Sequence, residues 1–227
     1  MPHKAIIAQL ISTFEAHRNP AYAAKMKWYM KDHFKFYGIA QPLRKELSKA
    51  FLHQLLVIEN VTPRLVIQQM WHHPEREILY VCLDYVAKAH KQWTADSIDD
   101  FEYMLTHYSW WDTVDTVATN LVGKYFQKWY DADYQRIEQW NNDNNMWLNR
   151  SAIIFQLKYK HKTDTEILFA CIETHRKSKQ FFHQKAIGWA LRELAKTQPK
   201  LVQNFVAQTE LMPLSVREAL KHLGNLN

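Results

Sequence analysis

The chain has 227 residues, a formal charge of +6 and a hydrophobic content of 47%. This is enough apolar sequence to bury a core, so the composition excludes an intrinsically disordered chain. No apolar run approaches the roughly 20 residues that a membrane-spanning helix needs, and the N-terminus has no secretory signature, so a soluble, cytoplasmic protein is expected.

The four glycines and seven prolines favour helices over sheets. Each glycine is isolated, which excludes Gly-rich phosphate loops and argues against tight hairpins. Asn19-Pro20 and Thr62-Pro63 each fit an N-cap followed by the first residue of a helix. The same opening position is expected for Pro42, Pro74 and Pro199.

Helical periodicity recurs along the chain. Four segments repeat it at intervals of roughly 35–38 residues, beginning at Ile78, Thr113, Ala152 and Ala186. This spacing is typical of HEAT-like repeats, which stack antiparallel helix pairs into a superhelix with a concave face. We therefore expect an all-α array that forms one domain over residues 1–227. The second helices of the pairs would line the concave face, and they carry Asp115, Arg150, Lys158, Lys185 and Arg192.

The two cysteines and twelve histidines form no ligand pattern. Cys82 and Cys171 lie far apart in apolar segments, so buried free thiols are expected, with a disulfide or redox pair as the alternative. The sequence has no HExxH motif and no Cys/His box. No metal site and no cofactor are therefore expected.

The charges are unevenly distributed along the chain. Residues 149–200 hold eleven Lys and Arg against four Asp and Glu, and residues 18–49 hold eight against two. Residues 96–133, between them, hold eight acids against two lysines. A single basic stretch is usually a solvated surface, but two separate stretches favour a polyanionic partner such as nucleic acid.

Three segments combine aromatic, charged and apolar residues. They are SWWDTVD from Ser109, NMWLNRSAIIFQLKYK from Asn145 and SKQFFHQKAIGWALRELAKTQP from Ser178. Taken singly, each has a purely structural interpretation. Asp112 would be the N-cap of the following helix and Asp115 an acid of its first turn. The tryptophans would then be core residues, and Arg150 would pair with a neighbouring acid.

Taken together, the three segments resemble the AlkD family of DNA alkylation-repair glycosylases. The resemblance runs through nearly the whole chain. It includes, in family order, MKWYMKDHFKFYGI with Pro42, Leu43 and Arg44, then PEREILY, the three segments above and the closing LSVREALKH. The resemblance implies a bacterial DNA-repair enzyme and agrees with the HEAT-like array that the periodicity predicts.

By position, the resemblance implies roles for particular residues. Asp115 would be the catalytic carboxylate, with Trp111 and Trp189 flanking the deoxyribose of the lesion. Arg150 would contact the adjacent phosphate, and Tyr29 the DNA backbone near the lesion. Further candidates for backbone contacts are Lys158, Lys185 and Arg192.

These residue types suit hydrolysis of the N-glycosidic bond of a cationic N3- or N7-alkylpurine. The alkylated base departs as a neutral molecule, so no general acid is needed. A fixed carboxylate would stabilise the positive charge that develops on the sugar, and indole faces would add about 0.5–2 kcal/mol each. In the first turn of a helix, the Asp115 carboxylate should have a lowered pKa. The resemblance also implies that the lesion stays stacked in the duplex, without base flipping.

The expected function is therefore base-excision repair of double-stranded DNA by a monomeric, monofunctional glycosylase. One alternative is a catalytically silent relative that recognises the shape of the DNA backbone. The other is a peptide-binding scaffold, which is a common use of HEAT-type arrays. A scaffold would need neither the carboxylate with its two tryptophans nor the two basic stretches.

Overall fold

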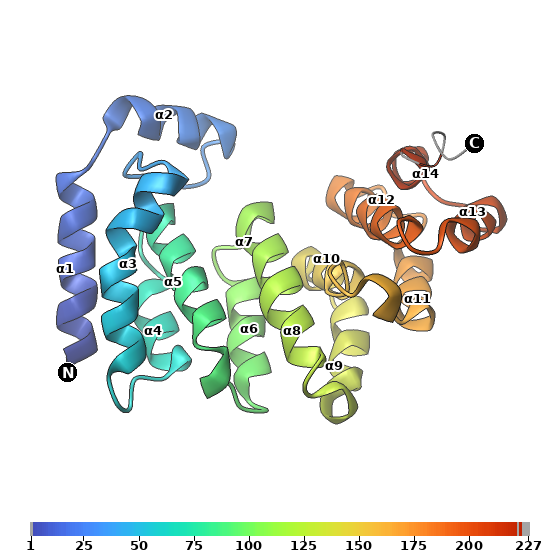
Figure 1. Ribbon diagram of the computed structural model, residues 1–227. Helices are drawn as coiled ribbons and strands as arrows, with labels where there is room; N and C mark the ends of the chain where they lie inside the picture. Colours follow the sequence, from blue (N-terminus) through green and yellow to red (C-terminus); the bar gives the residue numbers. More distant parts are fainter. Residues whose placement is uncertain (1, 222, 224–227) are drawn as a thin grey trace. The chain divides into compact units, whose positions relative to one another are not determined.

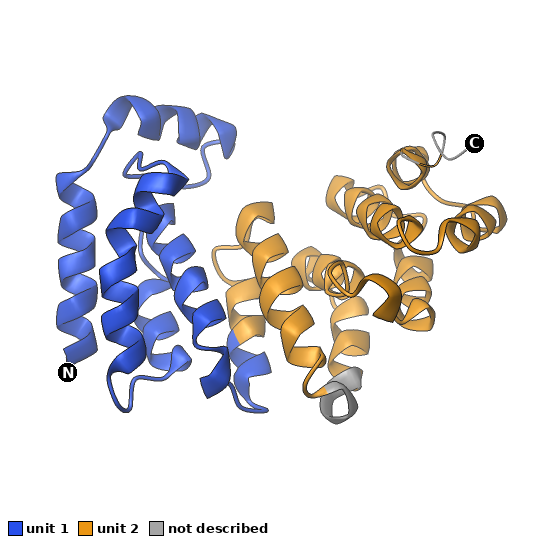
Figure 2. Ribbon diagram, in the orientation of Figure 1, with its two compact units in different colours: residues 1–100 blue, residues 101–227 orange. Residues whose placement is uncertain are grey.

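The computed structural model describes residues 2–221 and 223, and of residues 130–134 it describes the backbone alone. Within this part of the chain the secondary structure is helical and includes no β-strand, which confirms the all-α fold class. None of the described helices is long and apolar enough to cross a membrane. The chain forms two compact units, residues 1–100 and 101–227 (Figure 2). One domain over the whole chain stays a prediction.

A repeat of 35 residues sets the starts of the second helices of successive pairs. They begin at residues 41, 76, 111, 146 and 181 (Figure 1): α3 (Gln41–Val57), α5 (Arg76–Lys88), α7 (Trp111–Thr116), α10 (Met146–Ile154) and α12 (Phe181–Ala195). Another helix precedes each of the last four: α4 (Pro63–Met70), α6 (Ser97–Thr106), α9 (Tyr130–Asn141) and α11 (Thr165–His175). The repeated helix pairs predicted from the periodicity are thus confirmed.

Unit 1 is built around an apolar stripe on each of its long helices. In α1 (Pro2–Ala16), Ile7, Leu10 and Phe14 recur every three or four residues and are fully buried. This face packs on α3 and α4, and both of those helices pack on α5. After α5, a 3₁₀ turn, η1 (His90–Gln92), leads toward α6.

Helix α2 (Pro20–Tyr29) differs from its neighbours because it has no buried residue. It is fixed at its two ends. Asn19 caps the first turn by accepting a hydrogen bond from the Tyr22 amide at 3.0 Å, and the Asn19 amide donates to the Tyr37 carbonyl at 2.9 Å. At Gly38 the backbone has a φ of +85°, and a Cβ there would lie 2.1 Å from the Asn19 carbonyl oxygen. The segment after α2 therefore returns close to its start, which only glycine permits at position 38.

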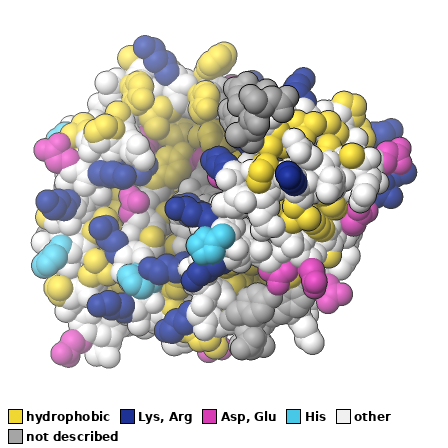
Figure 3. Space-filling view, turned by 45° about the vertical axis from the view of Figure 1, so that its right-hand side comes forward, with side chains coloured by type: hydrophobic (Ala, Val, Ile, Leu, Met, Phe, Trp, Pro, Cys, Tyr) yellow, Lys and Arg dark blue, Asp and Glu magenta, His cyan; other side chains and the backbone are white. Residues whose placement is uncertain are grey.

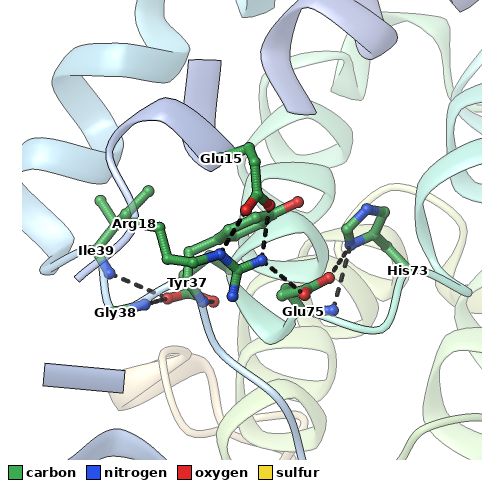
Figure 4. A network of polar contacts seen from close by, with 8 residues as sticks. Glu15, Arg18, Tyr37, Gly38, Ile39, His73 and Glu75 are labelled. Carbon is green, nitrogen blue, oxygen red and sulfur yellow. Dashed lines mark hydrogen bonds and ion pairs between the residues drawn. The ribbon is translucent and has the colours of Figure 1, made fainter. Parts of the chain in front are cut away.

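A buried carboxylate holds this returning segment. The Glu77 side chain is fully buried in α5 and accepts hydrogen bonds from the amides of Tyr37, Gly38 and Ile39 at 3.1, 2.8 and 3.1 Å. Beside it, Arg18 forms ion pairs with Glu15 at 2.7 Å and Glu75 at 3.1 Å (Figure 4). These contacts join α1, the ends of α2 and the start of α5.

Replacing Glu77 with Ala should lower the free energy of unfolding by about 3 kcal/mol or more, because each of three buried amides that loses its acceptor costs about 1–3 kcal/mol. Urea unfolding followed by circular dichroism measures the loss. The matched control is Glu46→Ala, at an exposed position of α3, where a change within about 0.5 kcal/mol is expected. Equal stability of the two variants would show that water replaces the carboxylate without cost.

In unit 2 the helix that starts at Trp111 continues without a break. α7 passes into a π-helical segment, η2 (Val117–Val122), and then α8 (Gly123–Phe126). α10 packs against α7, η2, α9 and α12. The C-terminal pair is α13 (Pro199–Gln208) and α14 (Pro213–Leu220), and α14 packs closely on α12. Gly188 allows this approach, because a Cβ at that position would lie 2.4 Å from the Glu218 Cβ.

Several local predictions are confirmed and others are wrong. Asn19 and Thr62 cap helices that begin at Pro20 and Pro63, as predicted. Pro74 instead precedes the N-cap Glu75, so α5 begins two residues after this proline. The expected buried free thiols are also confirmed, for Cys82 and Cys171. Burial raises the pKa of the Cys171 thiol to about 12, so this thiol is protonated at neutral pH.

The expected helix over AIIFQLKYK ends early. α10 stops at Ile154, and residues 155–158 form turns before the short 3₁₀ helix η3 (Lys160–Lys162). The Gln156 side chain accepts from the Asp164 amide at 2.8 Å and donates to the Asp164 carbonyl at 3.1 Å. This contact, made to the start of α11, holds the turn, so Lys158 lies outside the second helix on which it was predicted.

Candidate active site

The centre of the candidate site is an ion pair between Asp115 and Arg150. Each is the fifth residue of its helix, α7 and α10, so the 35-residue repeat gives the two side chains equivalent positions. Arg150 Nε donates to Asp115 Oδ1 at 2.7 Å and Nη2 donates to Oδ2 at 2.9 Å. Arg150 Nη1 donates to the Phe182 carbonyl at 2.8 Å. The arginine therefore pairs with an acid, as the structural interpretation of its segment expected.

The surroundings of Asp115 correct two expectations about its helix. The N-cap of α7 is Trp110 rather than Asp112, so Asp115 lies beyond the first turn, where the helix dipole has little effect. Burial raises the pKa of the Asp115 carboxyl, and the hydrogen bonds from Arg150 oppose this shift without cancelling it. The predicted lowering of this pKa is therefore wrong in direction. Its side chain is 18% exposed, against 5% for Arg150, so the carboxylate keeps some access from outside.

An aromatic cluster beside the ion pair was not predicted. Trp110, Trp147 and Phe182 meet with ring centroids 5.7, 5.4 and 4.8 Å apart, and the Arg150 guanidinium lies 5.8 Å from the Phe182 ring centre. Trp147 and Phe182 are both the second residue of their helices, α10 and α12. This shared repeat position is the signal by which the sequence could have revealed the cluster. The cluster therefore places aromatic rings next to the guanidinium of the ion pair.

The two tryptophans predicted to flank a sugar have different places in unit 2. Trp111 is the first residue of α7, one turn before Asp115, and is half-buried. Trp189 is half-buried on α12, one turn after Lys185. Lys185 is the fifth residue of its helix, as Asp115 and Arg150 are of theirs. Both indoles thus retain accessible surface, unlike the fully buried Trp71 and Trp140.

The predicted cations of unit 2 already have partners. Lys185 pairs with Glu218 at 2.9 Å, and Arg192 pairs with the other oxygen of the same carboxylate at 2.7 Å. The hydrogen bonds from Lys185 and Arg192 lower the pKa of the Glu218 carboxyl. The Lys158 amine donates a hydrogen bond to the side-chain oxygen of Asn120. The acid that binds two of these cations lies on α14, within the closing LSVREALKH segment, for which no site role was predicted.

Tyr29 belongs to unit 1, at the end of α2. Its side chain is 60% exposed, and the neighbouring Trp28 is 73% exposed. Lys25 and Lys27 lie on the same helix, which has no acid. Exposed aromatic side chains of this size, next to lysines, are typical of binding surfaces. Over the face seen in Figure 3, Lys and Arg side chains likewise occur beside exposed hydrophobic ones.

Comparisons with known proteins give one consistent result. A family model described as DNA alkylation repair enzyme matches residues 10–223. A solved structure titled "Predicted DNA alkylation repair enzyme from Enterococcus faecalis" is similar to this chain, with 32% sequence identity and a TM-score of 0.85. The match covers 91% of this chain and 96% of that one. No curated protein matches the chain.

Proposed function

The chain belongs to the DNA alkylation repair enzyme family, and on this premise we propose that it is a DNA glycosylase specific for alkylpurines. Its role lies in DNA alkylation repair, and its substrate is DNA. The proposed reaction is hydrolysis of the N-glycosidic bond of cationic N3- and N7-alkylpurines in duplex DNA, without base flipping. A monomer acting in the cytoplasm of a bacterium is part of the same proposal.

The observation that carries this proposal is the partly exposed Asp115 carboxylate, held by two hydrogen bonds from Arg150. Both carboxylate oxygens are oriented by the same guanidinium, so the side chain is fixed before any substrate binds. A preorganised charge stabilises a developing opposite charge without the cost of reorienting solvent. The Arg150 hydrogen bonds also favour the ionised form of Asp115 over the neutral form that burial favours.

In the proposed reaction the carboxylate of Asp115 faces the sugar as its bond to the base breaks. The electron pair of that bond leaves with the base, which is neutral after departure, and positive charge develops at C1′. Asp115 stabilises this charge and orients the water that adds to C1′, and the proton that this water loses passes to solvent. The faces of Trp111 and Trp189 would lie against the cationic sugar, where their negative quadrupole is favourable.

Arg150 has a second proposed role toward the phosphate next to the lesion. A guanidinium has five N–H donors, and the contacts to Asp115 and Phe182 use three of them. The donors that remain on Nη1 and Nη2 suit a phosphate oxygen. Contacts of Tyr29, Lys158, Lys185 and Arg192 with the DNA backbone belong to the same proposal. To bind phosphate, Lys185 and Arg192 would have to leave the Glu218 carboxylate.

Base release from methylated duplex DNA tests the proposed function. Purified protein in excess over the duplex should generate abasic sites at 3-methyladenine and 7-methylguanine. Binding to the duplex without any base release would instead favour a catalytically silent relative that recognises the DNA backbone. A protein that neither releases bases nor binds duplex DNA would contradict both.

Replacing Arg150 with Ala should shift the acid limb of the rate–pH profile to higher pH. Ionised Asp115 is the active form, so the rate falls as the pH decreases through the pKa of this carboxyl. Burial already raises that pKa, and the variant loses the hydrogen bonds that oppose the shift. Single-turnover base release measured across pH gives the limb directly.

Arg150→Lys is the companion variant. It keeps a positive charge but not the two-pronged contact, so its limb should lie between those of Arg150→Ala and the parent. Duplex affinity of Arg150→Ala should also fall, with a smaller dependence on salt. An unshifted limb in the Ala variant would show that Arg150 does not control the ionisation of Asp115.

A further inference from the structure

A pair of histidines lies beside Phe182, the residue whose carbonyl binds Arg150 in the candidate active site. His183 is the third residue of α12, and His175 is the last residue of α11. Their ring centroids are 4.5 Å apart, and the ring planes are tilted by 46°. His183 is buried and His175 is half-buried. The mechanism proposed above uses neither side chain.

The His183 ring ties the first turn of α12 to the loop that precedes it. Its Nδ1 forms a hydrogen bond of 2.8 Å with the Ser178 hydroxyl. The same hydroxyl oxygen accepts from the Gln180 amide at 3.2 Å, and the Ser178 carbonyl accepts from the Gln184 side chain at 3.2 Å. Gln180, the N-cap of α12, makes no capping hydrogen bond with its own side chain. His183 and Gln184 therefore anchor a helix start that its N-cap side chain leaves unanchored.

This helix start presents the backbone group that orients Arg150. The Phe182 carbonyl accepts a hydrogen bond from Arg150 Nη1 at 2.8 Å. Two further donors of the same guanidinium, Nε and Nη2, hold the carboxylate of Asp115. A guanidinium is planar and rigid, so a carbonyl that fixes one of its donors also fixes the direction of the others. The placement of the first turn of α12 thereby affects the contact between Arg150 and Asp115.

A second path leads from the histidines back to Arg150. His175 Nε2 forms a hydrogen bond of 2.8 Å with the Asn141 carbonyl, and Asn149 Nδ2 donates to the same carbonyl at 3.2 Å. Asn149 is buried and directly precedes Arg150 in α10. The contacts form a closed circuit through Arg150, Phe182, His183, His175, Asn141 and Asn149. A connected network of this kind rigidifies its members.

The His183 ring is uncharged at neutral pH. Burial, and to a smaller extent the charges of His175 and Arg150, lower the pKa of His183 to about 4, although the Met146 carbonyl at the start of α10 opposes the shift. Burial also lowers the pKa of His175. His183 therefore contacts Ser178 as a neutral hydrogen-bonding group. An Asn side chain can reproduce this contact, because its amide has a polar atom where the imidazole has Nδ1.

We propose that His183 is a positioning residue of the candidate active site. It holds the start of α12 in place, so that the Phe182 carbonyl keeps Arg150 oriented toward Asp115. The proposal rests on the proposed glycosylase for the role of Asp115 in catalysis. The orientation of the ion pair itself does not depend on whether the reaction occurs, so it can be tested separately.

The first test is the titration of the Asp115 carboxyl, followed by carbon-13 NMR with labelled aspartate and assigned with Asp115→Asn. His183→Ala removes the ring, so Arg150 should oppose the effect of burial less well and the pKa of Asp115 should rise. The expected change in the acid dissociation constant is about tenfold or more, the value of one hydrogen bond to a charged group. His183→Asn should restore the parental titration. His161→Ala, at an exposed position of unit 2, is the matched control and should leave it unchanged.

The second test is single-turnover base release from methylated duplex DNA at neutral pH. His183→Ala should release base up to about 100-fold more slowly than the parent, because a small misplacement of a catalytic group has an effect of this size. His183→Asn should recover most of the rate. If His183→Ala does not fold, Ser178→Ala replaces it, since this variant removes the hydrogen-bonding partner and leaves the ring in place.

Several results would overturn the proposal. A lower melting temperature of His183→Ala with a parental Asp115 titration would show a structural role alone. A raised pKa of Asp115 that His183→Asn fails to restore would show that the hydrogen bond to Ser178 is not what positions the pair. If the parent releases no base, the proposed glycosylase fails, and the Asp115 titration still decides the role of His183. If the parent releases base and the titration is the same in every variant, the positioning role alone fails.

Discussion

Asp115→Asn is expected to lower the rate of base release from methylated duplex DNA by at least about 100-fold, the scale at which one preorganised electrostatic contact contributes to a transition state. Asn keeps the shape of the side chain and one oxygen that can accept from Arg150, but it has no charge to stabilise the sugar cation. Duplex binding should persist, because phosphate contacts are made by other residues. Single-turnover base release and anisotropy, measured on the same preparation, separate the two effects.

Asp112→Asn is the matched control for this experiment. It removes the same charge from the same helix, one turn earlier, and leaves the pair between Asp115 and Arg150 in place. We expect near-parental base release at neutral pH. A rate for Asp115→Asn close to that of the control would make Asp115 a structural partner of Arg150 and nothing more. Melting temperatures of both variants show whether the fold is retained.

The fold was predictable because the signal is periodic. Apolar residues at helical spacing, prolines near helix starts and segments roughly 35–38 residues apart describe a stack of helix pairs, and the second helices begin two to six residues before the predicted segments. The same repeat makes the pair of Asp115 with Arg150 understandable, because 35 residues separate them and neighbouring second helices pack together. Both residues were named from the sequence, although their contact was not.

Features that depend on distant packing were not predictable. The direction of the Asp115 pKa shift follows from how deeply neighbouring helices bury the carboxylate, which the local position in α7 does not reveal. Glu218 binds Lys185 and Arg192 because Gly188 lets α14 approach α12, and α14 begins at residue 213, outside the 35-residue register. The early end of α10 likewise depends on Gln156 reaching the backbone of Asp164.

The choice of lesion should follow the charge of the base. Asp115 stabilises the sugar, and the proposed mechanism assigns no group that protonates the departing base. A lesion must therefore carry its own positive charge, which weakens its glycosidic bond. The protein should release N3- and N7-alkylpurines and leave hypoxanthine, uracil and ethenoadenine in place. Bulky N7 adducts should also be released, because a lesion that stays stacked need not fit a pocket.

The measurement is abasic-site formation in duplexes that each carry one lesion, incubated with excess protein under single-turnover conditions. The closest comparison is 7-methylguanine against its uncharged 7-deaza analogue, because the two differ mainly in charge and in bond lability. Asp115→Asn provides the background for every lesion, so that spontaneous loss of labile bases is subtracted. If the Asp115 carboxylate acts by electrostatics alone, Asp115→Asn should lower the rate of base release only for lesions whose base departs without being protonated. Efficient, Asp115-dependent release of a neutral lesion would require a proton donor or a base-reading pocket, and the mechanism proposed for this chain would then be wrong.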